Sequence, residues 1–302
     1  MKKIVVLGST NVDTILNIKR LPLPGETMAM DGQSSAGGGK GANQALAATR
    51  AGAETSFVSK IGDDHAADFM LDTFKKDGLN IDHVTETSKA GTGKAYILLD
   101  ENGQNSILIY GGANQTISID DINAAKETIK KSDCLISEFE TPISVTIEAF
   151  KIAKENGVIT ILNPAPAKDN IPLELLKLTD IIVPNETEAS AITGIKVEDK
   201  KSIINSAEKL NKMGINRVII TIGSRGSLYY SEGKEEFVDA YKVPAIDTTA
   251  AGDTFIGYLA AKLDSDLGNV VEAMKFASKA SSIAVQTKGA QNSIPYVEDV
   301  KI

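Results

Sequence analysis

The chain has 302 residues, of which 42% are hydrophobic and 24% are charged, and its net charge is -8. A chain of this length can bury a large core without staples, and its acidic balance argues against nucleic acid and anionic membranes as partners. One cysteine excludes an internal disulfide, and two histidines exclude a histidine-rich metal site. The apolar run at the N-terminus ends at Gly8, too short for a signal peptide or membrane span, so we expect a first strand of a cytoplasmic protein.

Short β-branched runs alternate with longer amphipathic stretches along the chain. Strands are predicted at Ile4–Leu7, Ser56–Ser59, Cys134–Ile136, Val158–Leu162, Ile181–Val183 and Val218–Thr221. Helices are predicted at Ala66–Lys76, Ile143–Asn156, Ile203–Met213, Gly252–Leu263 and Leu267–Gln286. Continuous apolar strands followed by helices indicate a mostly parallel sheet covered on both faces. No linker or repeat divides the chain, so we expect one α/β domain over residues 1–302.

The first predicted strand is followed by Gly8-Ser9-Thr10-Asn11-Val12-Asp13. Polar residues at this end of a parallel strand lie where α/β sheets bind ligands, although the GxGxxG pattern of dinucleotide folds is missing. Asn11 and Asp13 carry groups suited to sugar hydroxyls. A structural role at a turn or strand end fits the same two residues equally well.

Two segments, near residues 13–35 and 94–110, interrupt the alternation of strands and helices. The second is predicted to be a hairpin, with strands Ala95–Leu99 and Ser106–Tyr110 joined by a turn that contains Asn102-Gly103, a strong hairpin signal. The two segments can form a small separate sheet. A lid over a cleft and an ordinary surface hairpin are both compatible with this pattern.

The segment Gly37-Gly38-Gly39-Lys40-Gly41-Ala42-Asn43-Gln44-Ala45 opens an alanine-rich helix. Its glycines permit close backbone approach to a ligand. It is not a P-loop, because Gly41 stands where that motif requires Ser or Thr. Lys40 and Asn43 can project on one side of the helix start, but a glycine-rich turn alone is weak evidence for a site.

Polar residues also follow four other predicted strands. They are Glu140, Asn163, the group Asn185, Glu186 and Glu188, and the group Thr221, Gly223 and Gly226. Each can be a structural cap. Their recurrence at the carboxyl edge of one predicted sheet favours a shared cleft.

The segment Asp247-Thr248-Thr249-Ala250-Ala251-Gly252-Asp253-Thr254-Phe255 leads from a turn of small residues into a predicted helix. Backbone N–H groups at a helix start attract anions, and small side chains let a phosphate come close. Asp253 is either an N-terminal capping carboxylate or a base that deprotonates an alcohol during phosphoryl transfer.

Together these motifs resemble those of the ribokinase family of carbohydrate and nucleoside kinases, the PfkB type. The resemblance runs from the segment that begins at Gly8 to Lys288-Gly289-Ala290-Gln291, nearly the whole chain. The pairing of residues 38–45 with residues 247–255 is highly specific for the family. Asn185-Glu186-Thr187-Glu188 matches its Asn-x-x-Glu motif, which the family associates with magnesium and phosphate.

The resemblance implies a role for each matching residue. Those implied to bind ribose are Asn11, Asp13, Gly39, Lys40, Asn43, Glu140 and Asp253. Those implied to bind the nucleotide are Asn185, Thr221, Gly223, Gly226 and Gly252. Ala250, Ala251 and Gly252 are implied to form the anion hole, and Asp253 the catalytic base. The implied potassium site comprises Asp247, Thr249, Ala284, Thr287, Gly289 and Ser293, and Glu188 is linked to magnesium.

The resemblance also implies a three-layer α/β/α sandwich with a nine-stranded central sheet and a β-sheet lid that pairs in homodimers. The implied reaction is ATP-dependent phosphorylation of D-ribose at its 5-hydroxyl, with Mg²⁺ and K⁺ as cofactors. Another sugar or a nucleoside is the alternative substrate within the family. A catalytically silent sugar-binding or regulatory protein is the alternative class, against which the complete run from Ala250 to Asp253 argues.

Overall fold

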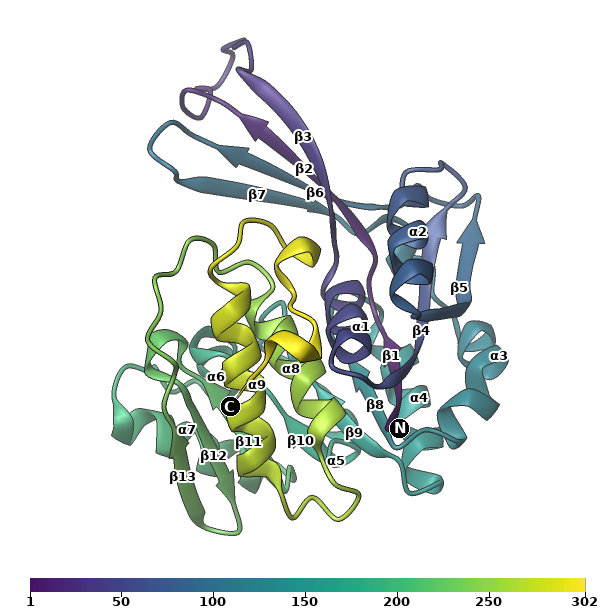
Figure 1. The fold of residues 1–302 in the computed structure, drawn as a ribbon, viewed down its shortest axis with the longest axis vertical. Coiled ribbons are helices and arrows are strands. Elements are labelled where there is room, and N and C mark those ends of the chain that lie inside the picture. The colour runs from purple at the N-terminus through teal and green to yellow at the C-terminus, as the bar shows by residue number, and fades with distance from the viewer. Residues whose placement is uncertain (302) are drawn as a thin grey trace.

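Two sheets form the framework of the computed structural model, which describes residues 1–301 (Figure 1). The larger has nine strands in the order β13-β12-β11-β10-β9-β8-β1-β4-β5. Its parallel strands are β1 (Lys3–Leu7), β4 (Glu54–Gly62), β5 (Asn80–Thr87), β8 (Cys134–Ser137), β9 (Ile159–Leu162), β10 (Ile181–Ile182) and β11 (Arg217–Thr221). An antiparallel pair, β12 (Ser227–Ser231) and β13 (Lys234–Val238), completes one edge.

Helices cover both faces of this sheet. One face carries α1 (Lys40–Arg50), α2 (Asp68–Asp77), α8 (Ala251–Lys262) and α9 (Val270–Ala284). The other carries α3 (Ile119–Lys130), α4 (Ile143–Glu155), α5 (Leu173–Lys177), α6 (Glu186–Thr193) and α7 (Lys200–Lys212). The period of two along a strand explains the layers: in β1, Ile4 and Val6 pack in one core, and Val5 and Leu7 pack in the other. The predicted α/β/α sandwich is confirmed.

The smaller sheet has four strands in the order β3-β2-β6-β7 and projects from the main body (Figure 1). Its strands are β2 (Asn11–Asn17), β3 (Gly32–Gly38), β6 (Gly93–Leu99) and β7 (Asn105–Tyr110). The predicted hairpin is confirmed as β6–β7, whose turn has Gly103 at φ 76°. Asp100 Oδ1 stabilises that turn by accepting the N–H groups of Asn102 and Gln104, both at 2.9 Å. The two interrupting segments therefore form one separate sheet, as expected.

Several helix starts differ from the predicted boundaries. α2 begins at Asp68 rather than at Ala66, and α7 begins at Lys200 rather than at Ile203. The last long helix, α9, begins at Val270 rather than at Leu267. Leu267 has φ 58°, a left-handed conformation that a right-handed helix excludes. None of the helices in the described part of the chain has the length and apolar character needed to cross a bilayer.

Candidate active site

A pocket of about 190 Å³ lies at the carboxyl ends of the central strands. Its lining comes from α1, the ends of β9, β10 and β11, and the start of α8, which are far apart in the sequence. The lining residues are Lys40, Asn163, Ala165, Val183, Asn185, Glu188, Thr221, Thr248, Ala250, Gly252, Asp253 and Ile256. Polar groups that follow different predicted strands thus meet in one cleft.

The glycine run before α1 lets that helix start lie against the turn between β1 and β2. Gly39 precedes α1 with φ 91°, and a Cβ there would lie 2.7 Å from the backbone nitrogen of Asn11. Glycine is therefore required both by backbone conformation and by space. The result is that Lys40, at the first position of α1, lies beside the residues that begin β2.

A hydrogen-bonded group at this junction centres on Glu140. Its Oε2 accepts from Ser9 Oγ at 2.5 Å, from Asn11 Nδ2 at 3.3 Å and from the N–H of Lys40 at 3.3 Å. Asn114, which sequence reasoning missed, donates from Nδ2 to Asn11 Oδ1 at 2.7 Å. Asn11 is thus held from both sides, by an acceptor and by a donor.

Glu138 is a second residue that sequence reasoning missed. It is fully buried, its Oε1 accepts the N–H of Ser9 at 2.6 Å, and its Oε2 accepts the N–H of Glu140. Burial, followed by the negative charge of Glu140, raises the pKa of Glu138 above its usual range. The available signal was an acidic residue within the apolar run from Leu135 to Phe139. Its position ties the β1–β2 turn to the end of β8.

The pKa values of Asp13 and Lys40, on the β2 and α1 side of the site, are both shifted. Burial, then the negative charges of Glu140 and Asp253, raise the pKa of Asp13 to about 7. No hydrogen bond from residues 1–301 contributes to that pKa. Burial by itself would lower the pKa of Lys40, but the charges of Asp253, Glu140 and Glu188 outweigh it and raise the pKa. The site therefore combines one buried ammonium with several carboxyl groups.

Asp253 lies in the first turn of α8 and is almost fully buried, with 8% of its surface exposed. Its Oδ2 accepts from Asn43 Nδ2 at 3.0 Å, and its Oδ1 accepts from Gln44 Nε2 at 2.9 Å. α8 has no side-chain cap, and the residue before it, Ala250, has φ 59°. Of the two sequence interpretations, a capping carboxylate does not match these contacts, because both oxygens face α1.

Asn185 and Glu188 form a capping box at the start of α6. Asn185 Oδ1 accepts the N–H of Glu188 at 2.9 Å, and Glu188 Oε2 accepts the N–H of Asn185 at 2.8 Å. Glu188 Oε1 also accepts from Asn185 Nδ2 at 2.9 Å. Burial raises the pKa of Glu188. The Asn-x-x-Glu spacing thus fixes the backbone at this wall of the pocket. Thr221 pairs with Asn185 through a parallel β-bridge.

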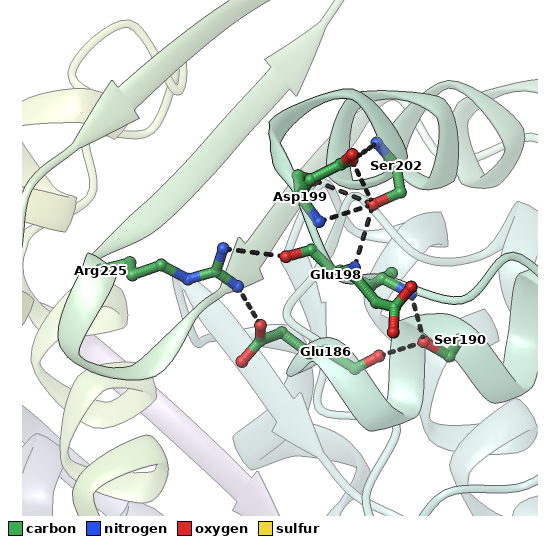
Figure 2. A network of polar contacts seen from close by, with 7 residues as sticks. Glu186, Ser190, Glu198, Asp199, Ser202 and Arg225 are labelled. Atoms are coloured by element: carbon green, nitrogen blue, oxygen red, sulfur yellow. Dashed lines mark hydrogen bonds and ion pairs between the residues drawn. The ribbon is translucent and has the colours of Figure 1, made fainter.

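The turn from Gly223 to Gly226 is anchored by Arg225, as Figure 2 shows. The Arg225 guanidinium forms an ion pair with Glu186 in α6 and donates to the carbonyl oxygen of Glu198 at 3.2 Å. The N–H of Glu198 in turn donates to Ser202 Oγ in α7 at 3.0 Å. This network links the turn to the helix that carries the capping box.

Asp247 joins two loops that are distant in the sequence. Its Oδ1 accepts the N–H of Thr249 at 2.9 Å, and its Oδ2 accepts the N–H of Gly289 at 2.9 Å. Burial opposes ionisation of Asp247, but hydrogen bonds from Thr249 and Gly289 outweigh it and lower the pKa. Ala284 and Thr287 lie at the end of α9 and in the turn after it, where the N–H of Thr287 donates to the carbonyl of Ala284 at 3.1 Å.

Not every predicted site residue lines the pocket itself. Ala251 is the first residue of α8. A second group lies where β2 and α1 begin: Asn11, Asp13, Gly39, Asn43 and Glu140. Two hydrogen bonds connect this group to the pocket, one between Lys40 and Glu140 and one between Asn43 and Asp253. Ser293 lies in the later loop, where its Oγ donates to the carbonyl of Ala290 at 2.7 Å. No cluster of three or more His, Cys, Asp or Glu side chains suited to a metal is found within residues 1–301.

The chain is similar over nearly its whole length to characterised kinases. It is 54% identical over 301 residues to a bifunctional ribokinase/ribose-5-phosphate isomerase A of Fructilactobacillus sanfranciscensis, covering 99% of this chain and 56% of that protein. It is 48% identical over 299 residues to a ribokinase of Staphylococcus aureus, covering 99% and 98%. The structure of Arabidopsis thaliana ribokinase complexed with ribose and ATP matches with a TM-score of 0.91 and 35% identity, covering 99% and 97%. The family model described as pfkB family carbohydrate kinase matches residues 1–296, so the chain belongs to the pfkB family of carbohydrate kinases.

Proposed function

We propose that this kinase transfers the γ-phosphoryl group of ATP to the 5-hydroxyl of D-ribose, giving ADP and D-ribose 5-phosphate. The observation that carries the proposal is the position of the Asp253 carboxylate. Asp253 lies at the start of α8 and lines the pocket, and the side-chain amides of Asn43 and Gln44 each donate to one of its oxygens. The ribokinases among its relatives support ribose as the sugar.

Asp253 is the general base in this proposal. It accepts the proton of the 5-hydroxyl as that oxygen bonds to the γ-phosphorus, while the bond to the bridging oxygen of ADP breaks. Ala250, Ala251 and Gly252 leave the N-terminus of α8 open, so its backbone N–H groups can stabilise negative charge on the transferring group.

The sugar hydroxyls are proposed to bind Asn11, Asp13, Gly39, Lys40, Asn43 and Glu140. Two unsatisfied groups support this assignment. Asn43 donates to Asp253, yet its buried Oδ1 has no hydrogen-bond partner within residues 1–301. Asp13 is a half-buried carboxylate whose pKa is raised to about 7, and no hydrogen bond from the described residues contributes to that pKa. A polyol can donate to both groups.

The nucleotide is proposed to lie along Asn185, Thr221, Gly223, Gly226 and Gly252. The anchored turn at residues 223–226 and the capping box at residues 185–188 support this position. Asn185, Glu188, Thr221 and Gly252 line the pocket that contains Asp253, whereas the turn at residues 223–226 lies just beyond Thr221, outside the lining.

Magnesium fits the site as an ion held mainly by ATP. Both oxygens of Glu188 already accept hydrogen bonds from Asn185, so this carboxylate would act on Mg²⁺ mostly through water. Magnesium commonly keeps several waters and relies on substrate phosphates and few carboxylates. When bound, it offsets charge on the phosphate oxygens.

Potassium fits the two loops that Asp247 joins. The proposed ligands are Asp247, Thr249, Ala284, Thr287, Gly289 and Ser293, partly through backbone carbonyls. Because K⁺ accepts flexible cages of carbonyl oxygens, a bound ion would order the turn that precedes Ala250.

The small sheet is proposed to be a lid within a single domain of residues 1–302, formed by segments 13–35 and 94–110. It carries Asp13, and its closure would exclude water from the reacting groups.

Exposed apolar residues on β7, among them Ile107, Leu108 and Ile109, support homodimer formation through the lid. Use of ATP and an unpaired, buried Cys134 support a cytoplasmic location.

The test of the proposal is Asp253→Asn in a coupled ADP-release assay. The substitution keeps the shape of the side chain but removes its ability to take a proton, so kcat should fall about 10²–10⁴-fold. ATP affinity should change little, because the anion hole is built from backbone. Wild-type turnover by the folded variant would refute the role of Asp253. Parallel assays with other pentoses, hexoses and nucleosides decide between ribose and another family substrate.

A further inference from the structure

We propose that Gln44 is a positioning residue for Asp253 and that Asn163 fixes the orientation of Gln44. The inference rests on the proposed function, in which Asp253 is the base. Gln44 has no exposed surface and does not line the pocket, so its contribution would be made entirely through Asp253.

The geometry assigns both amide protons of Gln44. Its Nε2 donates to Asp253 Oδ1 at 2.9 Å and to Asn163 Oδ1 at 3.0 Å. Asn163 is oriented in turn, because its Nδ2 donates to the carbonyl oxygen of Val183 at 3.2 Å. A chain of three hydrogen bonds therefore runs from the end of β10, through the end of β9, to the carboxylate.

Only one orientation of the Gln44 amide satisfies these neighbours. Reversing it would place Oε1 against the oxygens of Asp253 and Asn163, which are both acceptors. In the observed orientation Oε1 is buried without a partner among the described residues. Burying an unpaired carbonyl is unfavourable. The two hydrogen bonds that Nε2 donates therefore hold the side chain in this orientation.

The close approach of α1 and α8 makes the contact possible. Gly257 lies one turn after Asp253, and a Cβ there would be 2.8 Å from the carbonyl oxygen of Gln44 and 2.5 Å from Ala47 Cβ. Glycine within a helix is unfavourable relative to alanine, so close packing explains its presence here. It brings Gln44 within hydrogen-bonding distance of the base.

The consequence for chemistry is orientation of the base. Asn43 and Gln44 each hold one oxygen of Asp253, which fixes rotation of the carboxylate. Without Gln44, the carboxylate would be free to rotate away from the sugar hydroxyl.

The experiment replaces Gln44 by Met, which keeps the volume and removes both donors. We expect kcat to fall about 100-fold, the usual effect of misplacing a reacting group. KM values for ribose and ATP should stay within about threefold, because the substitution removes no interaction that binds the ground state and the transition state equally.

Repeating Gln44→Met in an Asp253→Ala background separates positioning from general structure. A residue that acts through Asp253 should then change the residual rate by less than about threefold. The matched control is Thr179→Val, which removes a buried hydrogen bond to the Leu175 carbonyl far from the pocket. It should lower thermal stability without changing kcat.

A second variant, Gln44→Glu, covers the case in which the Met variant does not fold. A carboxyl group at this position donates to Asp253 only when protonated, so activity relative to wild type should rise as pH falls. The positioning role would be overturned if Gln44→Glu showed no such recovery, or if kcat were unchanged in either folded variant. It would also be overturned if Gln44→Met lowered the rate equally in the wild-type and Asp253→Ala backgrounds. Full turnover by Asp253→Ala would overturn the proposed function as well, whereas an inactive Asp253→Ala with a fully active Gln44→Met overturns only the inference.

Discussion

The half-buried carboxylate of Asp13, which we propose binds the sugar, should weaken the fold. Its pKa is raised from 3.8 to about 7, first by burial and then by Glu140 and Asp253. Its oxygens lie against Gly38, where a Cβ would be 2.3 Å away, and no hydrogen bond compensates for burial. Asp13→Asn removes the charge and keeps the shape. We therefore expect this variant to be more stable than wild type in the absence of sugar.

The sign and magnitude of the stability change in Asp13→Asn follow from linkage between ionisation and folding. A carboxyl group whose pKa is raised in the folded state does not change the free energy of unfolding below pH 3.8. Above that pH it lowers the free energy of unfolding by an amount that increases with pH and is complete above pH 7. At about 1.4 kcal/mol per pH unit, the full penalty is about 4 kcal/mol, and at about pH 5 it is about 1.6 kcal/mol. The stability gain of Asp13→Asn should therefore grow with pH.

The assay is urea unfolding of sugar-free protein at about pH 5 and about pH 8, followed by far-UV circular dichroism. Asp31→Asn, an exposed change just before β3, is the control and should alter stability by less than about 0.5 kcal/mol. The KM for ribose should rise about 10–100-fold in Asp13→Asn, because an NH2 donor replaces one of the two oxygens that can accept from a sugar hydroxyl. A stability gain that is independent of pH, or a loss of stability at both pH values, would refute the assignment of an unpaired, half-buried charge.

Three further predictions concern the loops and the lid. Potassium, titrated at constant ionic strength, should activate the enzyme saturably in ribose phosphorylation assays, and Asp247→Ala should abolish that response; full activity without any monovalent metal ion would exclude the site. Arg225→Ala should raise the KM for ATP about fivefold and leave the KM for ribose unchanged, since the partly exposed pair with Glu186 contributes about 1 kcal/mol; equal effects on both substrates in steady-state kinetics would contradict this. Light scattering should detect a dimer that Ile109→Lys converts to monomer, whereas Leu173→Lys, equally exposed at 58% but outside the lid, should remain dimeric; an Ile109→Lys dimer would refute pairing through β7.

The sequence alone predicted the layers, the separate sheet and a shared cleft at the carboxyl edge of the strands. Apolar runs such as Ile4–Leu7 encode strands buried on both sides, because their alternate residues all enter a core. Asn102-Gly103 encodes a hairpin turn through the conformational freedom of glycine. The turn before Asp253 was also visible, because small residues before a helix form a local pattern.

Only the tertiary structure decided which side chains act together. Gln44 meets Asp253 across 209 residues, Glu138 meets Ser9 across 129, and Asn114 meets Asn11 across 103. Sequence periodicity reports which face of an element is buried, but not the partner packed against that face. In isolation Asp253 is read more readily as a helix cap than as a base. Its contacts with α1, which depend on the close packing of two helices at Gly257, argue against the cap, because both carboxylate oxygens are directed at α1.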